Sequence, residues 1–186
     1  ITALTVMNNH KPVSKKVKVT VRRRHRLLIT GPNGIGKTTL LESLAEGREK
    51  GAKLAKGAIV GYYRQDFSGL PTDKTVYDVL AGAMESPNHQ LIYATAARFL
   101  LPGDKVQTLV GALSEGQKGL LCFARFMLQK PSLLILDEPT NHINFRHLPV
   151  IAQALDAFEG GMILVSHDLE FVNQIQMTEE LNLGEI

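Results

Sequence analysis

Hydrophobic positions along the chain fall into short apolar runs that alternate with longer amphipathic stretches. Runs of about four to eight apolar residues bounded by turn signals predict buried strands. These runs are Arg26–Thr30, Ala58–Tyr63, Ser132–Leu136 and Met162–Ser166. The stretches that predict helices are Thr38–Ala45, Thr75–Met84, roughly 88–100, about 16 residues from Ser114, Arg146–Phe158 and Leu169–Ile175. Such alternation favours an α/β fold whose mostly parallel sheet is covered on both faces.

Residues 66–130 interrupt this alternation, because every regular stretch among them predicts a helix. We therefore expect a helical subdomain inserted over 66–130 into a core made of 1–65 and 131–186. The total of 186 residues suits a single domain. Ser114, with Gln117 three residues later, matches a capping box and so predicts the start of the long helix.

The first 26 residues have a different charge from the rest of the chain. They contain eight Lys or Arg and no acid, whereas the remainder carries 13 bases against 18 acids, and the total is +3. We expect a small antiparallel β part at the N-terminus, and the alternation of Val17, Val19 and Val21 with Lys18 and Thr20 predicts an edge strand protected by charge. The alternative is a basic surface that binds a polyanion such as RNA.

Composition excludes several classes of protein. A hydrophobic content of 44% is too high for a disordered chain. No apolar run approaches the ~18 residues of a membrane span, so we expect no membrane insertion. The single cysteine, Cys122, cannot form an internal disulfide, which is typical of the reducing cytoplasm and of a small buried side chain. No leader is recognised before the first strand, and a start at Ile1 suggests a fragment of a longer protein.

A glycine-rich loop follows the strand Arg26–Thr30 and precedes a helix. It matches G-x-x-x-x-G-K-[ST], a phosphate-binding loop. Its glycines let backbone N–H groups converge on an anion, to which the helix adds its positive end. Lys37 can reach the β and γ phosphates, and the Thr38 hydroxyl can bind Mg²⁺. The predicted nucleotide-binding residues are Gly31, Pro32, Asn33, Gly34, Ile35, Gly36, Lys37, Thr38 and Thr39.

Two adjacent carboxylates, Asp137 and Glu138, end the apolar run Ser132–Leu136. Ligands of parallel sheets bind at this edge, so Asp137 would meet the Mg²⁺ that accompanies a triphosphate. Glu138 would then take a proton from water or orient it for attack on the γ phosphate. Pro139 argues against a helix start or a simple turn at this position.

With these motifs the chain resembles the ATP-binding cassette (ABC) ATPases, over nearly its whole length. Leu113–Gln117 is similar to the signature L-S-G-G-Q, with Glu115 in place of the first glycine. Gln65 resembles the glutamine that senses Mg²⁺ and the attacking water, and His167 the histidine that contacts the γ phosphate. The resemblance implies a RecA-like P-loop NTPase fold, a magnesium site of Thr38, Gln65 and Asp137, and catalysis by Glu138, His167 and Gln65.

The signature implies an assembly of two cassettes. In this family the helix after the signature points at the nucleotide of a second cassette. Ser114, Glu115, Gly116 and Gln117 would therefore serve the partner's ATP in trans. Two cassettes would enclose two ATP molecules and separate after hydrolysis.

The run Asp137–His142, "DEPTNH", resembles the family F branch, which usually has D-E-P-T-N-H-L-D. This resemblance implies two cassettes in one chain, no membrane domain, and action on the ribosome as a translation factor or in antibiotic resistance. Residues 157–172 are more similar to the C-terminal cassette than to the first. The alternative is the ATP-binding subunit of a membrane transporter, with a membrane partner. A chromosome-organising ATPase is disfavoured, since only 28 positions separate Lys37 from Gln65 and no heptad run occurs.

Three features depart from the family pattern. Asn144 stands where the family usually has an aspartate, so communication between cassettes would be weaker. Glu115 places a negative charge near the incoming triphosphate, and we expect binding to survive it. No Phe, Tyr or Trp precedes the glycine-rich loop, so His10, an apolar residue or the partner would contact the adenine.

Overall fold

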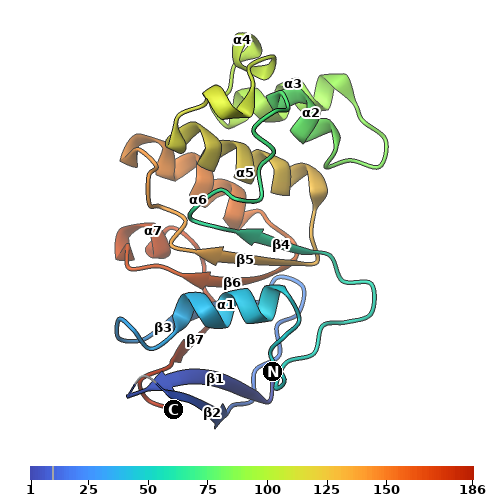
Figure 1. The fold of residues 1–186 in the computed structure, drawn as a ribbon. Helices are drawn as coiled ribbons and strands as arrows, with labels where there is room; N and C mark the ends of the chain where they lie inside the picture. Colours follow the sequence, from blue (N-terminus) through green and yellow to red (C-terminus); the bar gives the residue numbers. More distant parts are fainter. Residues whose placement is uncertain (10) are drawn as a thin grey trace.

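Five parallel strands form the central sheet, in the order β4-β5-β6-β3-β7 (Figure 1). The protein is described here by a computed structural model that covers residues 1–9 and 11–186. The strands are β3 (Arg26–Thr30), β4 (Val60–Tyr63), β5 (Leu133–Asp137), β6 (Gly161–Val165) and β7 (Glu179–Asn182). The predicted α/β fold with a parallel core sheet is therefore confirmed.

Alternate residues of the strands enter two hydrophobic clusters, one on each face of the sheet. Leu134 and Leu136 of β5 belong to one cluster, and Ile135 between them belongs to the other. Met162 and Ile163 of β6 divide in the same way. Since side chains alternate along a strand, burial on both faces requires the continuous apolar runs seen in the sequence.

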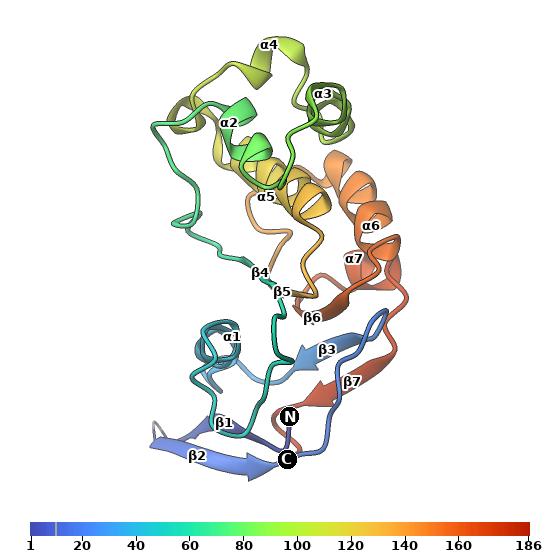
Figure 2. The ribbon, with the colours of Figure 1, turned by 90° about the vertical axis from the view of Figure 1, so that its right-hand side faces the viewer.

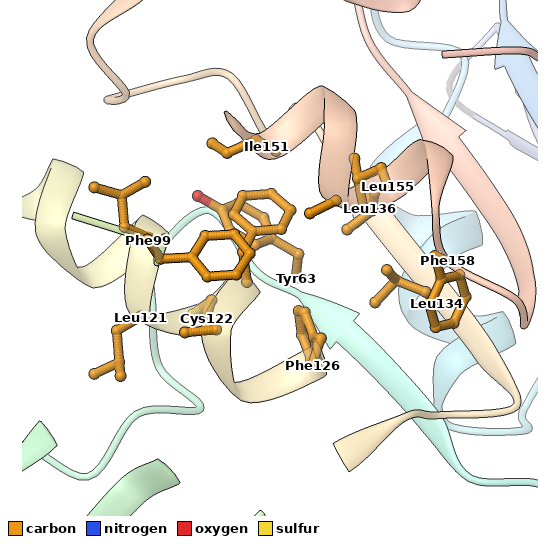
Figure 3. Close-up of a cluster of buried hydrophobic side chains, with 14 of the residues drawn as sticks. Tyr63, Phe99, Leu121, Cys122, Phe126, Leu134, Leu136, Ile151, Leu155 and Phe158 are labelled. Carbon is orange, nitrogen blue, oxygen red and sulfur yellow. The ribbon is translucent and has the colours of Figure 1, made fainter. Parts of the chain in front are cut away.

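The first cluster lies beneath α5 (Glu115–Gln129), α6 (Leu148–Asp156) and α7 (Leu169–Asn173) (Figure 1). Figure 3 shows Tyr63, Phe126 and Leu155 among its side chains. The short helices α2 (Val76–Ala81), α3 (His89–Arg98) and α4 (Gly103–Val106) lie beyond α5, on the side away from the sheet (Figure 2). Two 3-10 turns complete the helical elements, η1 (Val110–Ala112) and η2 (Phe145–His147).

The second cluster is covered by α1 (Lys37–Ala45) and by a hairpin of β1 (Ala3–Asn8) and β2 (Lys11–Lys16) (Figure 2). This hairpin is the predicted antiparallel part. The edge strand expected from Val17 to Val21 is wrong, because β1 begins at Ala3 opposite Lys16 and the regular ladder ends there. The valine pattern nevertheless has a packing role, since Val19 is buried in this cluster.

Helices α2, α3, α4 and α5 occupy the segment between β4 and β5, and α2, α3 and α5 are the helices that the sequence predicts there, whereas α4 was not predicted. The expected helix over Thr75–Met84 is shorter, because Thr75 caps α2 and Gly82 ends it. The helix expected from Arg146 begins at Leu148, after η2. Strand β7 was not predicted, because its sequence "EELN" contains one apolar residue and lies at the edge of the sheet. No helix in the described parts of the chain is long and apolar enough to cross a bilayer.

Candidate functional site

The glycine-rich loop joins β3 to α1 and depends on backbone angles that favour glycine. Gly31, Gly34 and Gly36 have φ of 144°, 82° and 93°. A Cβ atom at Gly36 would come within 3.0 Å of Cγ of Met7. Met7 also donates its N–H to the carbonyl oxygen of Ile35 at 2.9 Å, so β1 supports the loop from below. Glycine at these positions gives a loop whose N–H groups can turn toward an anion.

Lys37 folds back over this loop. Its Nζ donates to the carbonyl oxygens of Gly31 at 2.8 Å and Pro32 at 3.2 Å. These bonds hold the ammonium beside the first turn of α1, where the positive end of the helix dipole lies. Thr38 and Thr39 follow and are exposed, so the loop, the ammonium and the hydroxyls present donors on one side.

Asp137 ends β5 next to the start of α1, and only 2% of it is exposed. Burial raises the pKa of Asp137, a hydrogen bond from Thr38 lowers it, and the negative charges of Glu138 and Glu42 raise it again. Lys37 has a smaller lowering effect on the pKa. The hydrogen bond places Asp137 beside Thr38, and a cation bound here would relieve the excess negative charge.

Glu138 has a backbone φ of 45°, which turns the chain sharply after β5. Its N–H donates to the carbonyl oxygen of Val165 at the end of β6, at 2.9 Å. Oε2 of Glu138 accepts from the backbone N–H of His167 at 3.1 Å. Oε1 is buried and lies 3.3 Å from Nε2 of His167, but has no well-aligned hydrogen bond within the described residues. One carboxylate oxygen is therefore anchored, and the other keeps an open acceptor position.

Gln65 lies in the exposed turn after β4. Strand β4 pairs with β5 so that Tyr63 is opposite Leu136. Because the strands are parallel, Gln65 and Asp137 both lie at the carboxyl ends of the strands, which form one edge of the sheet. The structure thus gathers at this edge the glycine-rich loop, Asp137, Glu138, His167 and the turn that carries Gln65.

The signature residues lie at the start of α5. Ser114 and Gln117 form the predicted capping box, with bonds of 3.2 Å and 3.0 Å between side chain and backbone. Oε2 of Glu115 is 3.0 Å from Nδ1 of His142, and a Cβ atom at Gly116 would meet the carbonyl oxygen of His142 at 3.0 Å. The signature therefore contacts the segment after Glu138, while the described hydrogen bonds and ion pairs include none from it to the glycine-rich loop.

Other residues proved to have local roles or to lie outside the site. Oδ1 of Asn144 accepts a hydrogen bond from the N–H of Arg146 at 3.0 Å, so that Asn144 caps the start of η2. His10, one candidate for the adenine contact, lies outside the described residues. Sequence reasoning overlooked Glu42, whose charge acts on Asp137. Its position four residues after Thr38, on the same helix face, was the available signal.

A cavity of about 1030 Å³ lies at the opposite edge of the sheet, where β5 and β6 begin. Phe126, Leu133 and Phe158 are among its lining residues. Since the glycine-rich loop and the two carboxylates lie where β3 and β5 end, this cavity is separate from the site described above.

Comparison with known proteins identifies the family of this chain. The sequence profile described as ABC transporter matches residues 14–141, which include the glycine-rich loop, the signature and Glu138. The chain belongs to this family. The match confirms the resemblance inferred from the motifs.

Relatives of this ABC cassette include members of the F branch. The "Probable ATP-binding protein YbiT" of Escherichia coli O157:H7 is 32% identical over 94% of this chain and 34% of that protein. "ABC transporter F family member 5" of Arabidopsis thaliana is 35% identical over 89% of this chain and 25% of that protein. The chain thus spans a quarter to a third of the length of these relatives.

A solved structure supports the fold of the cassette. It is the "Dimeric structure of a post-hydrolysis state of the ATP-binding cassette MJ0796 bound to ADP and Pi". The TM-score is 0.71 at 16% sequence identity, over 98% of this chain and 93% of that one. At this identity, the likeness concerns the fold.

Proposed function

We propose that this ABC cassette binds ATP with Mg²⁺ between the glycine-rich loop and the ends of β5 and β6, and hydrolyses it. The observation that carries the proposal is the position of Asp137, a buried acid that is hydrogen-bonded to Thr38, the residue that directly follows Lys37 at the start of α1. The N–H groups of residues 31–39 and the Lys37 ammonium would bind the phosphates.

The residues at this edge suit a magnesium ion that shares its ligands with phosphate. Oxygen donors are the preferred ligands of Mg²⁺, and the Asp137 carboxylate and the Thr38 hydroxyl are adjacent. Gln65 emerges at the same edge and would complete the protein's share. Within the described residues no group of three or more His, Cys, Asp or Glu could hold a metal alone. When bound, Mg²⁺ neutralises phosphate charge during transfer.

Glu138 is proposed to orient the attacking water and to accept its proton. Its Oε1 has no hydrogen-bond partner in the described chain, while Oε2 is held by the backbone N–H of His167. The His167 side chain is 61% exposed and so can reach a phosphate outside the protein surface. His167 would contact the γ phosphate, and Gln65 would hold the water from the side of β4.

A second cassette, in the same chain or in a second copy, is proposed to complete the site. Glu115 and Gly116 of the signature lie against His142 of their own chain, and Ser114 and Glu115 are exposed at the start of α5. Ser114, Glu115, Gly116 and Gln117 would there meet the ATP of the partner. The related cassette of known structure is dimeric, with ADP and Pi. Residues 66–130, which carry this helix, would form a subdomain on the core of 1–65 and 131–186.

We further propose that the whole protein is a cytoplasmic ABC-F protein that acts on the ribosome, and that this chain is its C-terminal cassette. "DEPTNH" from Asp137 to His142 and the F-branch relative support the F branch, and the resemblance of residues 157–172 supports the C-terminal position. Sedimentation of the intact Glu138→Gln protein with ribosomes and ATP is the test. Co-purification with a membrane complex, in place of ribosome binding, would indicate the transporter alternative.

The test of the enzymatic proposal is Glu138→Gln in the intact protein. The amide keeps the shape of the side chain and an acceptor for the N–H of His167, but it cannot take a proton. ATP affinity by calorimetry should stay within about twofold, and turnover should fall about 10²–10⁴-fold. Lys37→Ala, in contrast, should weaken binding itself. Unchanged turnover in Glu138→Gln would remove Glu138 as the base, and unchanged affinity in Lys37→Ala would refute the phosphate-binding loop.

A further inference from the structure

Arg64 is the residue between the end of β4 and Gln65, and its guanidinium reaches helix α1. Nη2 is 3.1 Å from Oε1 of Glu46, and Nη1 is 3.7 Å from Oε1 of Glu42. Residues four positions apart lie on one face of a helix. Glu42 on α1 and Glu46, the residue that caps its C-terminus, therefore hold between them the arginine that directly follows β4.

The aromatic ring of Tyr62 supports the same guanidinium from the sheet side. Cζ of Arg64 lies 4.9 Å from the centroid of the Tyr62 ring. Burial, followed by the negative charges of Asp137 and Glu42, raises the pKa of Tyr62. The Arg64 guanidinium thus lies between the Tyr62 ring and the carboxylates of Glu42 and Glu46.

We propose that Arg64 is a positioning residue, which ties the backbone of Gln65 to the helix that carries Lys37 and Thr38. The inference rests on the proposed function, since it assigns Arg64 to the alignment of Gln65 with bound Mg²⁺. Glu42 lies one helical turn after Thr38, so a displacement of the first turn of α1 moves the carboxylate that holds Arg64. The Thr38 hydroxyl, proposed to bind Mg²⁺, and Gln65 are then coupled through the side chain of Arg64.

Because these charged groups are partly exposed, removal of Arg64 should affect catalysis much more than the stability of the fold. The Arg64 side chain is 34% exposed, and Glu42 and Glu46 are 37% and 42% exposed. Ion pairs that exposed contribute little to folding, so removal of Arg64 should leave the unfolding midpoint nearly unchanged. Alignment of a reacting group is far more sensitive, because a misplacement of about 1 Å can cost about 100-fold in rate.

Arg64→Ala in the intact protein is the test, and Arg48→Ala is its matched control. Arg48 also pairs with Glu46 but contacts neither Tyr62 nor Glu42 in the described ion pairs and cation–π contacts. Arg64→Ala should lower kcat for ATP about tenfold and raise the Mg²⁺ concentration for half-maximal activity several-fold. ATP affinity in EDTA should be unchanged. Arg64→Lys, which keeps the charge but lacks the planar fork, should restore part of the rate.

The outcomes distinguish this inference from the function on which it rests. If the wild type hydrolyses ATP, and Arg64→Ala matches Arg48→Ala in kcat and in Mg²⁺ dependence, the positioning role is wrong and the proposed function stands. A loss of ATP affinity in EDTA with an unchanged Mg²⁺ dependence would also overturn it. If the wild type and Arg48→Ala hydrolyse no ATP, the proposed function fails first.

Discussion

Replacement of Tyr63 by phenylalanine is expected to stabilise the protein, although it removes a polar group from the core. Tyr63 is 1% exposed, within the cluster of Figure 3. Its ring stacks on Phe123 with centroids 5.0 Å apart and meets Phe67 edge-on at 6.0 Å. The hydroxyl has no hydrogen-bond partner among the described residues. A buried hydroxyl without a partner loses its bonds to water and gains none in the protein.

The size of the effect follows from this desolvation. An unpaired buried polar group costs about 1–3 kcal/mol. Phenylalanine keeps both ring contacts but leaves a small void where the oxygen was, close to Gly119, so the lower part of that range applies. We expect the free energy of unfolding to rise by about 1–2 kcal/mol, which corresponds to an increase in Tm of about 2–8 °C.

The dependence of stability on pH provides a second measurement. Burial raises the pKa of the Tyr63 hydroxyl well above its ordinary value of 10.0. The unfolded chain therefore releases this proton above pH 10 while the folded chain retains it. The corresponding stability is fully present below pH 10 and is lost as the pH rises toward the folded pKa. Tyr63→Phe should lose less stability than the wild type between pH 10 and 11.

Urea unfolding followed by circular dichroism measures both effects, since the chain has no tryptophan. Tyr93→Phe is the matched control, because the Tyr93 hydroxyl accepts from Nε2 of Gln107 at 3.0 Å. The control should be neutral or slightly less stable than the wild type. A Tyr63→Phe protein that is less stable than the wild type at pH 7 would refute the reasoning and imply a partner for the hydroxyl.

Two further predictions concern the site. Asp137→Asn should stabilise the nucleotide-free protein at neutral pH, because the raised pKa of Asp137 means that stability of the wild type is lost as the pH rises from about 3.8. The free energy of unfolding should therefore change less between pH 4 and 8 in the variant than in the wild type. Calorimetry should show weaker Mg²⁺-dependent ATP binding by the variant. Ser114→Ala should lower the free energy of unfolding by about 1 kcal/mol through loss of the cap on α5; an unchanged denaturation midpoint would argue against the capping box.

Local patterns predicted most of the fold and of the candidate site. The apolar runs of β3, β5 and β6 predicted strands because burial on both faces needs continuous hydrophobicity. The glycines of residues 31–36 and the end of β5 at Asp137 also depend on local chemistry, so their spacing in the sequence was sufficient to predict the loop and the end of the strand. The strand expected over 17–21 is absent from the ladder of β1 and β2, although Val19 is buried. An alternating pattern indicates which side chains are buried, but it does not specify which strand would pair with the segment.

The sequence by itself determined which residues are candidates to bind phosphate, hold a metal and accept a proton, because those abilities belong to the side chains and to their immediate order. Only the tertiary structure decided which charges meet. The charge of Glu42 acts on Asp137, Arg64 joins the end of β4 to α1, and Glu115 meets His142. These pairs combine residues from separate elements, and their contacts follow from the order of strands in the sheet, which no short stretch of sequence encodes.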